Sequence, residues 1–244
     1  MIRYQLFFAA ALGCCSVASA SITTSAVDDF SNTTNTATSE WSYRWSPDSV
    51  RDGDYPLLAT NSDPATLWTP TTPYWNNGGS LPGVGVNQSG SAINISPPFL
   101  PFSWPTDTIW MHPPSTGFAV VTWTSPVTGT ADIEFEFDDM DPNGAFANGV
   151  RWYVDVGDVS GSLANGSFVG GTGIMPMTVT DVAVNSGEQV HFIVDPFGDF
   201  SFDSTAFRAT VTYVPEPASM ALLGLGAASL FVTNRKSLCG PRAA

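Results

Sequence analysis

A short acidic run at 138–144 has the spacing of an oxygen-ligand calcium loop. Asp139, Asp141 and Asn143 alternate and a glycine follows them, which matches the opening D-x-D-x-N-G of such loops. Alternate oxygen ligands can curl round one hard cation, and the glycine permits the sharp turn. The bidentate acid that would complete the loop is missing, because Val150 stands at that position. Two interpretations remain open: a calcium site, or an acidic β-turn whose residues serve backbone geometry.

A second group of oxygen ligands, Asp199, Asp203 and Ser204, is an alternative place for calcium, the one cofactor that the sequence suggests. Zinc is not expected, since the chain has two histidines and its three cysteines lie close to its two ends. The N-terminal and C-terminal segments that hold these cysteines are expected to be removed, which would leave a body without thiols or disulfides.

Groups for catalysis are sparse, and we predict no catalytic residue. His191 lies in an alternating apolar run and is predicted to be a strand residue, while His112 precedes two prolines at a loop or strand end. No G-x-S-x-G nucleophile elbow occurs. Glu134 and Glu136 share one face of a predicted strand, and a glycosidase needs two carboxylates about 5 to 10 Å apart. A solvated acidic face would show the same pattern.

Aromatic residues gather between positions 41 and 105, where proline and glycine are too frequent for long elements. We predict short strands and ordered loops packed on a sandwich. Trp41, Trp45, Trp68 and Trp75 could stack on the apolar face of a sugar ring, which would make this stretch a carbohydrate site. The alternative is that these rings fill the core.

The charge of the body excludes one class of partner. Between Ser21 and Val214 there are 21 acidic residues against four arginines and no lysine, a net charge of −17. Such a chain cannot neutralise phosphates, so nucleic acid is not a partner. The acidity could bind divalent cations or serve only to keep an exported protein soluble.

Strand signals become clear after position 107. The expected strands are 117–124, 130–138, 149–156, 177–180, 188–195 and 205–213. In the second of them Ile133, Phe135 and Phe137 should point inward and Glu134 and Glu136 outward. Strands at short spacing with turn residues between them predict an all-β protein with an antiparallel sandwich.

The C-terminal segment has the composition of a membrane anchor. Pro215, Glu216 and Pro217 precede an uncharged apolar segment, which ends before Arg235 and Lys236. The 18 residues from 217 to 234 would form roughly 27 Å of helix, close to the hydrocarbon thickness of a bilayer. The basic pair suits a cytoplasmic end. We predict a transmembrane helix; a buried core helix is the alternative.

The Pro215-Glu216-Pro217 tripeptide, the apolar segment after it and the basic pair Arg235-Lys236 resemble the PEP-CTERM sorting signal of Gram-negative bacteria. The resemblance implies that an exosortase, a membrane-embedded protease-transpeptidase, cuts near the Pro-Glu-Pro and releases or attaches the protein at the cell surface. The chain departs from the usual signal in its extra residues 237–244, which are expected to form a cytoplasmic tail.

The order of the later strands is also similar to jelly-roll modules attached to PEP-CTERM proteins and to some carbohydrate-binding modules. The similarity rests on Trp110–Pro113, Val120–Trp123, Asn148–Tyr153, Ser186–Val194 and Asp203–Thr205. It implies a noncatalytic jelly roll and transfers no binding residues.

The N-terminus has the features of a secretory signal peptide. One positive charge, an apolar run and the small residues Ala18 and Ala20 predict cleavage by signal peptidase after Ala20. A lipoprotein signal using Cys14 is the alternative. Residues 21–40, rich in Ser, Thr and Asn, are expected to form a weakly ordered leader or a first edge strand.

The predicted domains are therefore a signal peptide (1–20), a leader (21–40), a jelly-roll-like β-sandwich (41–213), a sorting signal with a transmembrane helix (214–236) and a tail (237–244). The function that follows is that of a noncatalytic protein exported through the inner membrane, transiently anchored there, and then placed at the cell surface or in the extracellular matrix. One alternative is a carbohydrate-binding module tethering the cell to exopolysaccharide. Another is a jelly-roll glycoside hydrolase or lyase.

Overall fold

The computed structural model describes residues 20–62, 72–95, 102–141, 148–169 and 176–216. The chain divides into a compact unit, Ser21–Pro215, and a second unit of Met1–Ala20 with Glu216–Ala244. Of the second unit only Ala20 and Glu216 are among the described residues, so the predicted signal peptide and tail helix lie outside them. In the described part no helix is long and apolar enough to cross a membrane.

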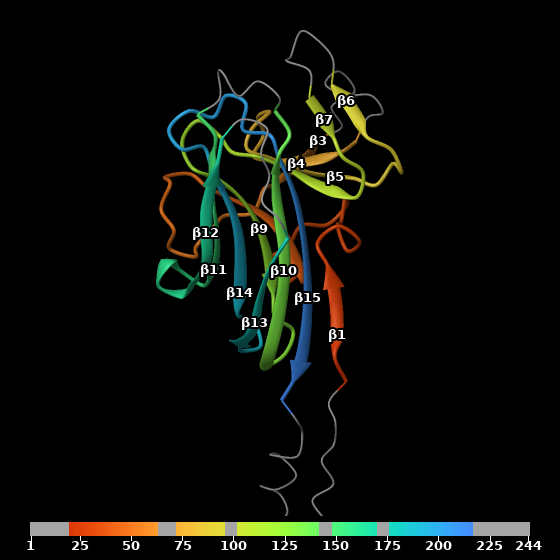
Figure 1. Ribbon diagram of the computed structural model, residues 1–244, viewed down its shortest axis with the longest axis vertical. Coiled ribbons are helices and arrows are strands. Elements are labelled where there is room, and N and C mark those ends of the chain that lie inside the picture. Colours follow the sequence, from red (N-terminus) through yellow and green to blue (C-terminus); the bar gives the residue numbers. More distant parts are fainter. Residues whose placement is uncertain (1–19, 63–71, 96–101, 142–147, 170–175, 217–244) are drawn as a thin grey trace, which may run out of the picture. The chain divides into compact units, whose positions relative to one another are not determined.

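Two large antiparallel β-sheets form most of the described part of the compact unit (Figure 1). Sheet I has the order β13 (Met177–Val184), β10 (Gly129–Asp139), β15 (Thr205–Pro215), β8 (Thr108–His112), β5 (Gly83–Asn87), β4 (Tyr74–Asn76) and β3 (Thr60–Ser62). A further strand, β1 (Ile22–Ser25), pairs with β15. Sheet II has the order β12 (Ser162–Phe168), β11 (Val150–Val156), β14 (Gln189–Asp195), β9 (Phe118–Thr124) and β2 (Trp41–Ser46).

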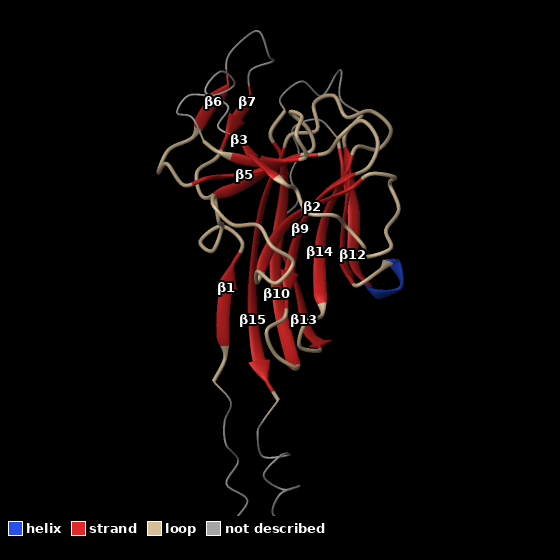
Figure 2. Cartoon of the chain, turned by 180° about the vertical axis from the view of Figure 1, so that it is seen from behind, coloured by secondary structure: helices blue, strands red, loops and turns tan. Residues whose placement is uncertain are grey.

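Smaller elements complete the unit. A hairpin pairs β6 (Ile93–Ile95) with β7 (Phe102–Trp104), and a 3₁₀ turn, η1 (Val159–Gly161), is the blue element of Figure 2. From β8 to β15 the chain passes repeatedly between the sheets, so that β8, β10, β13 and β15 belong to sheet I and β9, β11, β12 and β14 to sheet II.

Alternation of side chains explains why β10 forms and how it lies. Ile133, Phe135 and Phe137 are buried, while Glu134 is exposed and Glu136 half-buried, as the period of two predicts. Beside it β15 pairs in register along all eleven residues, from Gly129 opposite Pro215 to Asp139 opposite Thr205. Both strands have a partner on each side in sheet I, and they carry polar side chains on its outer face.

The core is formed by aromatic rings from both sheets. Phe137 and Phe207 of sheet I have ring centroids 5.0 Å apart. Phe207 lies 5.0 Å from Phe192, and Phe137 lies 5.4 Å from Trp152, both of sheet II. All four rings are buried, and burial of this area is the main force that holds the sheets together.

The strand predictions for the later part of the chain are confirmed. The six predicted strands correspond to β9, β10, β11, β13, β14 and β15. Two strands of this part, β8 and β12, were not predicted. The polar and glycine residues of β12 show no apolar alternation, and β12 has only β11 as its partner in sheet II. An edge strand of this kind buries little and so has a weak sequence signal.

The first part of the chain also belongs to the sandwich. In the segment predicted as a leader or an edge strand, β1 pairs with β15, and Ala26, Val27 and Phe30 are buried in the core. The aromatic stretch 41–105 contributes β2 to sheet II, β3, β4 and β5 to sheet I, and the β6–β7 hairpin. Within the described residues of this stretch, the structure thus has the short strands that the sequence predicts.

Candidate functional site

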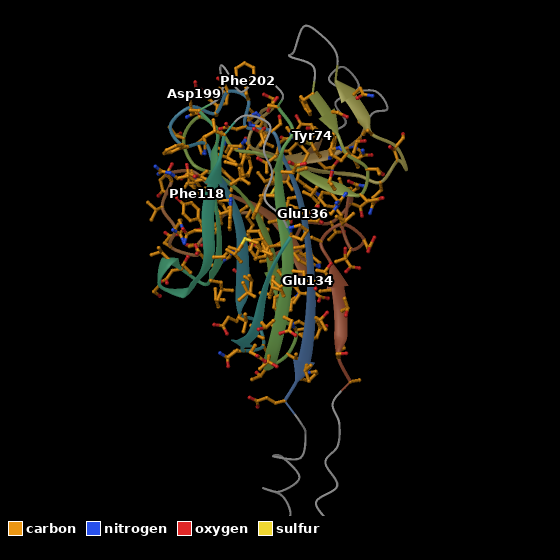
Figure 3. The ribbon with its side chains drawn as sticks, viewed as in Figure 1. Tyr74, Phe118, Glu134, Glu136, Asp199 and Phe202 are labelled. Carbon is orange, nitrogen blue, oxygen red and sulfur yellow. The ribbon has the colours of Figure 1, made fainter. Side chains whose placement is uncertain are left out.

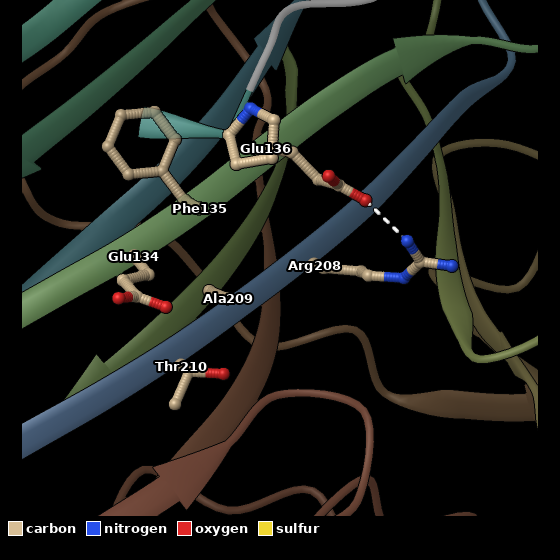
Figure 4. A pocket seen from close by; sticks show the side chains of 7 residues that line it. Glu134, Phe135, Glu136, Arg208, Ala209 and Thr210 are labelled. Atoms are coloured by element: carbon tan, nitrogen blue, oxygen red, sulfur yellow. Dashed lines mark hydrogen bonds and ion pairs between the residues drawn. The ribbon is translucent and has the colours of Figure 1, made fainter. Parts of the chain in front are cut away.

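A shallow hollow lies on the outer face of sheet I, over β10 and β15 (Figure 4). Its volume is about 180 Å³, and the outward side chains Glu134, Glu136, Arg208 and Thr210 line it together with Pro176. The register of the two strands places Glu134 opposite Thr210 and Glu136 opposite Arg208. Neighbouring strands therefore bring four polar groups together although they are far apart in the sequence.

Arg208 is held in place by three acceptors. Its Nη1 lies 2.6 Å from Glu136 Oε1, its Nε donates to the Asp107 carbonyl at 2.7 Å, and its Nη2 donates to the Thr106 carbonyl at 3.1 Å. Figure 3 places Glu134 and Glu136 along β10, and Figure 4 shows Glu134 and Thr210 away from the ion pair. Glu134 is exposed and has no hydrogen-bond or ion-pair partner within the described residues.

This arrangement suits hydrogen bonding to a polar ligand better than acid–base chemistry. A carboxylate, a hydroxyl and a fixed guanidinium can bind neighbouring hydroxyl groups. A glycosidase needs one carboxyl group that holds a proton for the leaving group. Glu136 instead binds a guanidinium, which leaves Glu134 as the one carboxylate of the pair without a partner.

The tryptophans predicted to stack on a ligand have other roles in the structure. Trp41 is 3% exposed and its Nε1 donates to Thr24 Oγ1 at 2.8 Å; Trp75 is 7% exposed and its Nε1 donates to the Ser31 carbonyl at 2.8 Å. The stacking prediction is wrong for these two, because burial leaves no ring face for a sugar. Trp45 is partly buried against the core, and Trp68 lies outside the described residues.

The predicted calcium loop contains an Asp-capped turn. Asp139 Oδ1 accepts a hydrogen bond from the Asp141 main-chain N–H at 2.9 Å, as the β-turn alternative requires. Asp141 is 3% exposed, and Asn143 lies outside the described residues. In the described segments no group of three or more His, Cys, Asp or Glu side chains is placed to hold a metal ion.

The second predicted calcium group is split by its surroundings. Asp199 is exposed at the loop end of the sandwich, where Figure 3 also labels Phe202, and its Oδ1 accepts from the Ser201 N–H at 3.0 Å. Asp203 is buried, and Ser204 donates its main-chain N–H to Asp141 Oδ2 at 2.8 Å. The two groups that the sequence offered as alternatives therefore meet at Asp141 and Ser204.

Both histidines lie where the sequence predicts. His191 is a buried residue of β14, and its Nδ1 lies 2.9 Å from Thr122 Oγ1. Burial, and then the nearby positive charge of Arg44, lower the pKa of His191 to about 3. His112 ends β8, with Nδ1 2.8 Å from the Pro113 carbonyl. Arg208 and Thr210 were not predicted as site residues, because their only signal in the sequence is their alternate, outward position in the predicted strand 205–213.

The residues of the sorting signal begin inside the sandwich. Pro215 is the last residue of β15 and lies opposite Gly129, Glu216 follows it, and Pro217, Arg235 and Lys236 lie outside the described residues. A protein-family model described as the PEP-CTERM protein-sorting motif matches residues 214–236. The chain carries a PEP-CTERM sorting motif. This confirms the resemblance seen in the sequence, over the same residues.

Three solved structures are among those to which this chain is similar. The K1 cleaved adhesin domain of Lys-gingipain from Porphyromonas gingivalis W83 is 12% identical, with 80% of this chain and 99% of that chain covered and a TM-score of 0.36. The CBM51 domain of a GH95 protein from Clostridium perfringens, solved with methyl-galactose, is 15% identical. The match covers 52% of this chain and 83% of that chain, with a TM-score of 0.31.

The third structure is the CBM36-1 domain of a multidomain xylanase from the hindgut metagenome of Trinervitermes trinervoides. It is 14% identical, with 55% of this chain and 96% of that chain covered and a TM-score of 0.29. No curated protein matches the chain.

Proposed function

We propose that this chain is a noncatalytic cell-surface or extracellular-matrix protein that is exported through the inner membrane and sorted by its PEP-CTERM tail. The sorting motif at 214–236 is the observation that carries the proposal. It begins at Val214 and Pro215, the last two residues of β15. The body is a strongly acidic sandwich, which stays soluble in the cell envelope.

In this proposal signal peptidase removes residues 1–20, and residues 217–234 span the inner membrane as a helix, with Arg235 and Lys236 and the tail 237–244 on the cytoplasmic side. An exosortase then cuts near Pro215–Pro217 and the body reaches the surface or matrix. The body itself is a jelly roll in this view. The orders β8-β15-β10-β13 and β9-β14-β11-β12 support that assignment, since they are the two four-stranded sheets of such a fold.

A tail fusion tests the proposal. Residues 214–244 are joined to a secreted reporter in a Gram-negative host that has an exosortase, and membrane, surface and medium fractions are compared. We expect membrane partitioning and then a shortened product outside the cell. Triple replacement of Pro215, Glu216 and Pro217 by alanine should leave the full-length fusion in the membrane. A wild-type fusion that never enters the membrane fraction would refute the sorting role.

A second candidate function is binding of a cell-surface polysaccharide at the hollow on sheet I. The exposed Glu134, next to Thr210 and the fixed guanidinium of Arg208, offers acceptors and donors for sugar hydroxyls. A glycan array probed with the full chain and with Glu134→Gln would test it. Binding that the substitution weakens supports the site, and an empty array counts against it. Turnover of a bound polysaccharide would instead favour the hydrolase or lyase alternative.

A further inference from the structure

Two buried carboxylates meet where β10 ends and β15 begins. Asp141 is 3% exposed and Asp203 is 1% exposed. The pairing of Asp139 with Thr205 brings the two segments together, and the Met140 N–H donates to the Ser204 carbonyl at 2.9 Å. The Ser204 N–H in turn donates to Asp141 Oδ2 at 2.8 Å. Asp141 is thus fixed beside the residue that follows Asp203.

The buried Asp203 carboxylate has no hydrogen-bond donor in the described residues that would offset the cost of its burial. Neither Oδ1 nor Oδ2 receives a hydrogen bond within the described residues, although both atoms are inaccessible to solvent. A buried carboxylate without donors or a counter-charge is strongly unfavourable, so such groups are normally paired, protonated or bound to a metal. This orphaned side chain is an observation independent of the local acidity, and it points to a missing partner.

The charged groups that shift the pKa of Asp203 are all carboxylates, so none of them can serve as its counter-ion. After burial, the carboxylates of Asp141, Asp199, Asp139 and Asp195, in that order, raise the pKa of Asp203 to about 9. Asp141 is affected too, since burial is the main cause that raises its pKa to about 6. Either Asp203 stays a neutral acid, or a cation from solution compensates both carboxylates.

We propose that Asp141 and Asp203 hold one divalent cation of the calcium type at the loop end of the sandwich. Calcium accepts six to eight oxygen ligands, and main-chain carbonyls and water complete sites that have few carboxylates. This accounts for a site where fewer than three acidic side chains converge. It differs from both sequence-based candidates, because it takes one residue from each. The inference does not depend on the sorting role.

Calorimetry on the full chain, purified in detergent and stripped of metal with a chelator, tests the site. We expect wild type to bind one Ca²⁺ with a Kd of about 10⁻⁴ to 10⁻³ M, the range of extracellular modules. Asp203→Asn and Asp141→Asn should each weaken binding by about tenfold or more. Asp199→Asn is the matched control, since it removes the same charge from an exposed position in the same loop, and it should bind as wild type does.

Thermal melting gives a second measure of Ca²⁺ binding, through the change in melting temperature that Ca²⁺ causes in each variant. Millimolar Ca²⁺ should raise the melting temperature of wild type and Asp199→Asn but not that of Asp203→Asn, by the linkage of binding to folding. A wild type that shows neither heat of binding nor a shift in melting would overturn the proposal and leave Asp203 as a neutral acid. Equal Ca²⁺ affinity in wild type, Asp203→Asn and Asp141→Asn would overturn it as well, because the ion would then bind elsewhere on the acidic surface.

Discussion

Arg51 and Asp155 lie 104 positions apart and form a two-point ion pair on the outer side of sheet II. Arg51 Nη2 is 2.5 Å from Asp155 Oδ1 and Arg51 Nε is 2.8 Å from Oδ2. The Asp155 side chain is fully buried, and the guanidinium lies 3.8 Å above the ring of Tyr153. The pair therefore fastens the segment after β2 onto β11.

Breaking this pair should be costly. Arg51→Met leaves the Asp155 carboxylate buried without its counter-charge, which costs about 3 to 5 kcal/mol when one partner of a buried pair is lost. We expect the free energy of unfolding, measured by urea titration, to fall by about that amount. The double variant Arg51→Met/Asp155→Asn should lose less than the single one, since no charge is then left unpaired.

The Glu136–Arg208 pair is the matched control. Its side chains are 24% and 45% exposed, and exposed ion pairs contribute about 0 to 1 kcal/mol. Arg208→Met should therefore lower the free energy of unfolding far less than Arg51→Met. Equal losses in the two variants would contradict the argument from burial.

Trp41 offers a test that separates packing from ligand binding. Its ring lies between the sheets, 6.1 Å from Phe192, and its indole N–H bonds to Thr24. Trp41→Ala should lower the free energy of unfolding by about 3 to 5 kcal/mol, as expected for removal of a large buried aromatic. Trp41→Phe keeps most of the apolar volume and should lose less. A Trp41→Ala variant as stable as wild type but with reduced glycan binding would restore the stacking role.

Much of the fold could be predicted because the strands that build it are half-buried and alternate. Ile133, Phe135 and Phe137 repeat with a period of two, and the structure buries all three. The β12 edge strand has no such pattern and was not predicted. The composition of residues 21–40 predicts a weakly ordered leader or an edge strand. In the structure, Phe30 of this segment is buried against Tyr43, with ring centroids 4.1 Å apart.

The candidate sites were harder to predict because they depend on pairing between distant strands. Asp141 and Asp203 belong to separate motifs in the sequence and meet only through the register of β10 and β15. Arg208 acquires its partner Glu136 in the same way. Local spacing reports which oxygen ligands are available, whereas strand register decides which of them converge.

Gly83 contacts a group of buried aromatic rings, Tyr74, Trp104 and Trp110, and a substitution at Gly83 tests how tightly they are packed. Trp110 lies between Tyr74 and Trp104, with ring centroids 5.6 Å and 6.2 Å away, and a Cβ on Gly83 would stand 2.4 Å from Trp110 Cζ3. Gly83→Ala should therefore lower the free energy of unfolding by about 1 to 3 kcal/mol through overpacking. Gly79→Ala is the control, since its nearest contact would be an ordinary 3.7 Å, and it should be nearly neutral in the same urea titration.

His191 should make stability depend on pH in a defined window. Its neighbours are Thr122, which shares a hydrogen bond with it, Tyr55, whose ring lies edge-on at 4.9 Å, Arg44, and Asp155, whose charge Arg51 compensates. Its pKa is about 3 when folded and about 6.5 when unfolded, so between these values the unfolded chain binds more protons. Stability from this group is therefore complete above about pH 6.5 and is lost as the pH falls.

The variant His191→Asn removes this titration while other acidic groups continue to titrate. The difference in free energy of unfolding between wild type and His191→Asn should shrink by about 1.4 kcal/mol per pH unit from pH 6 to pH 4, because one proton is linked to unfolding. Urea titrations of both proteins across that range measure it. A difference that stays constant with pH would show that His191 is protonated alike in both states, which its burial beside Arg44 argues against.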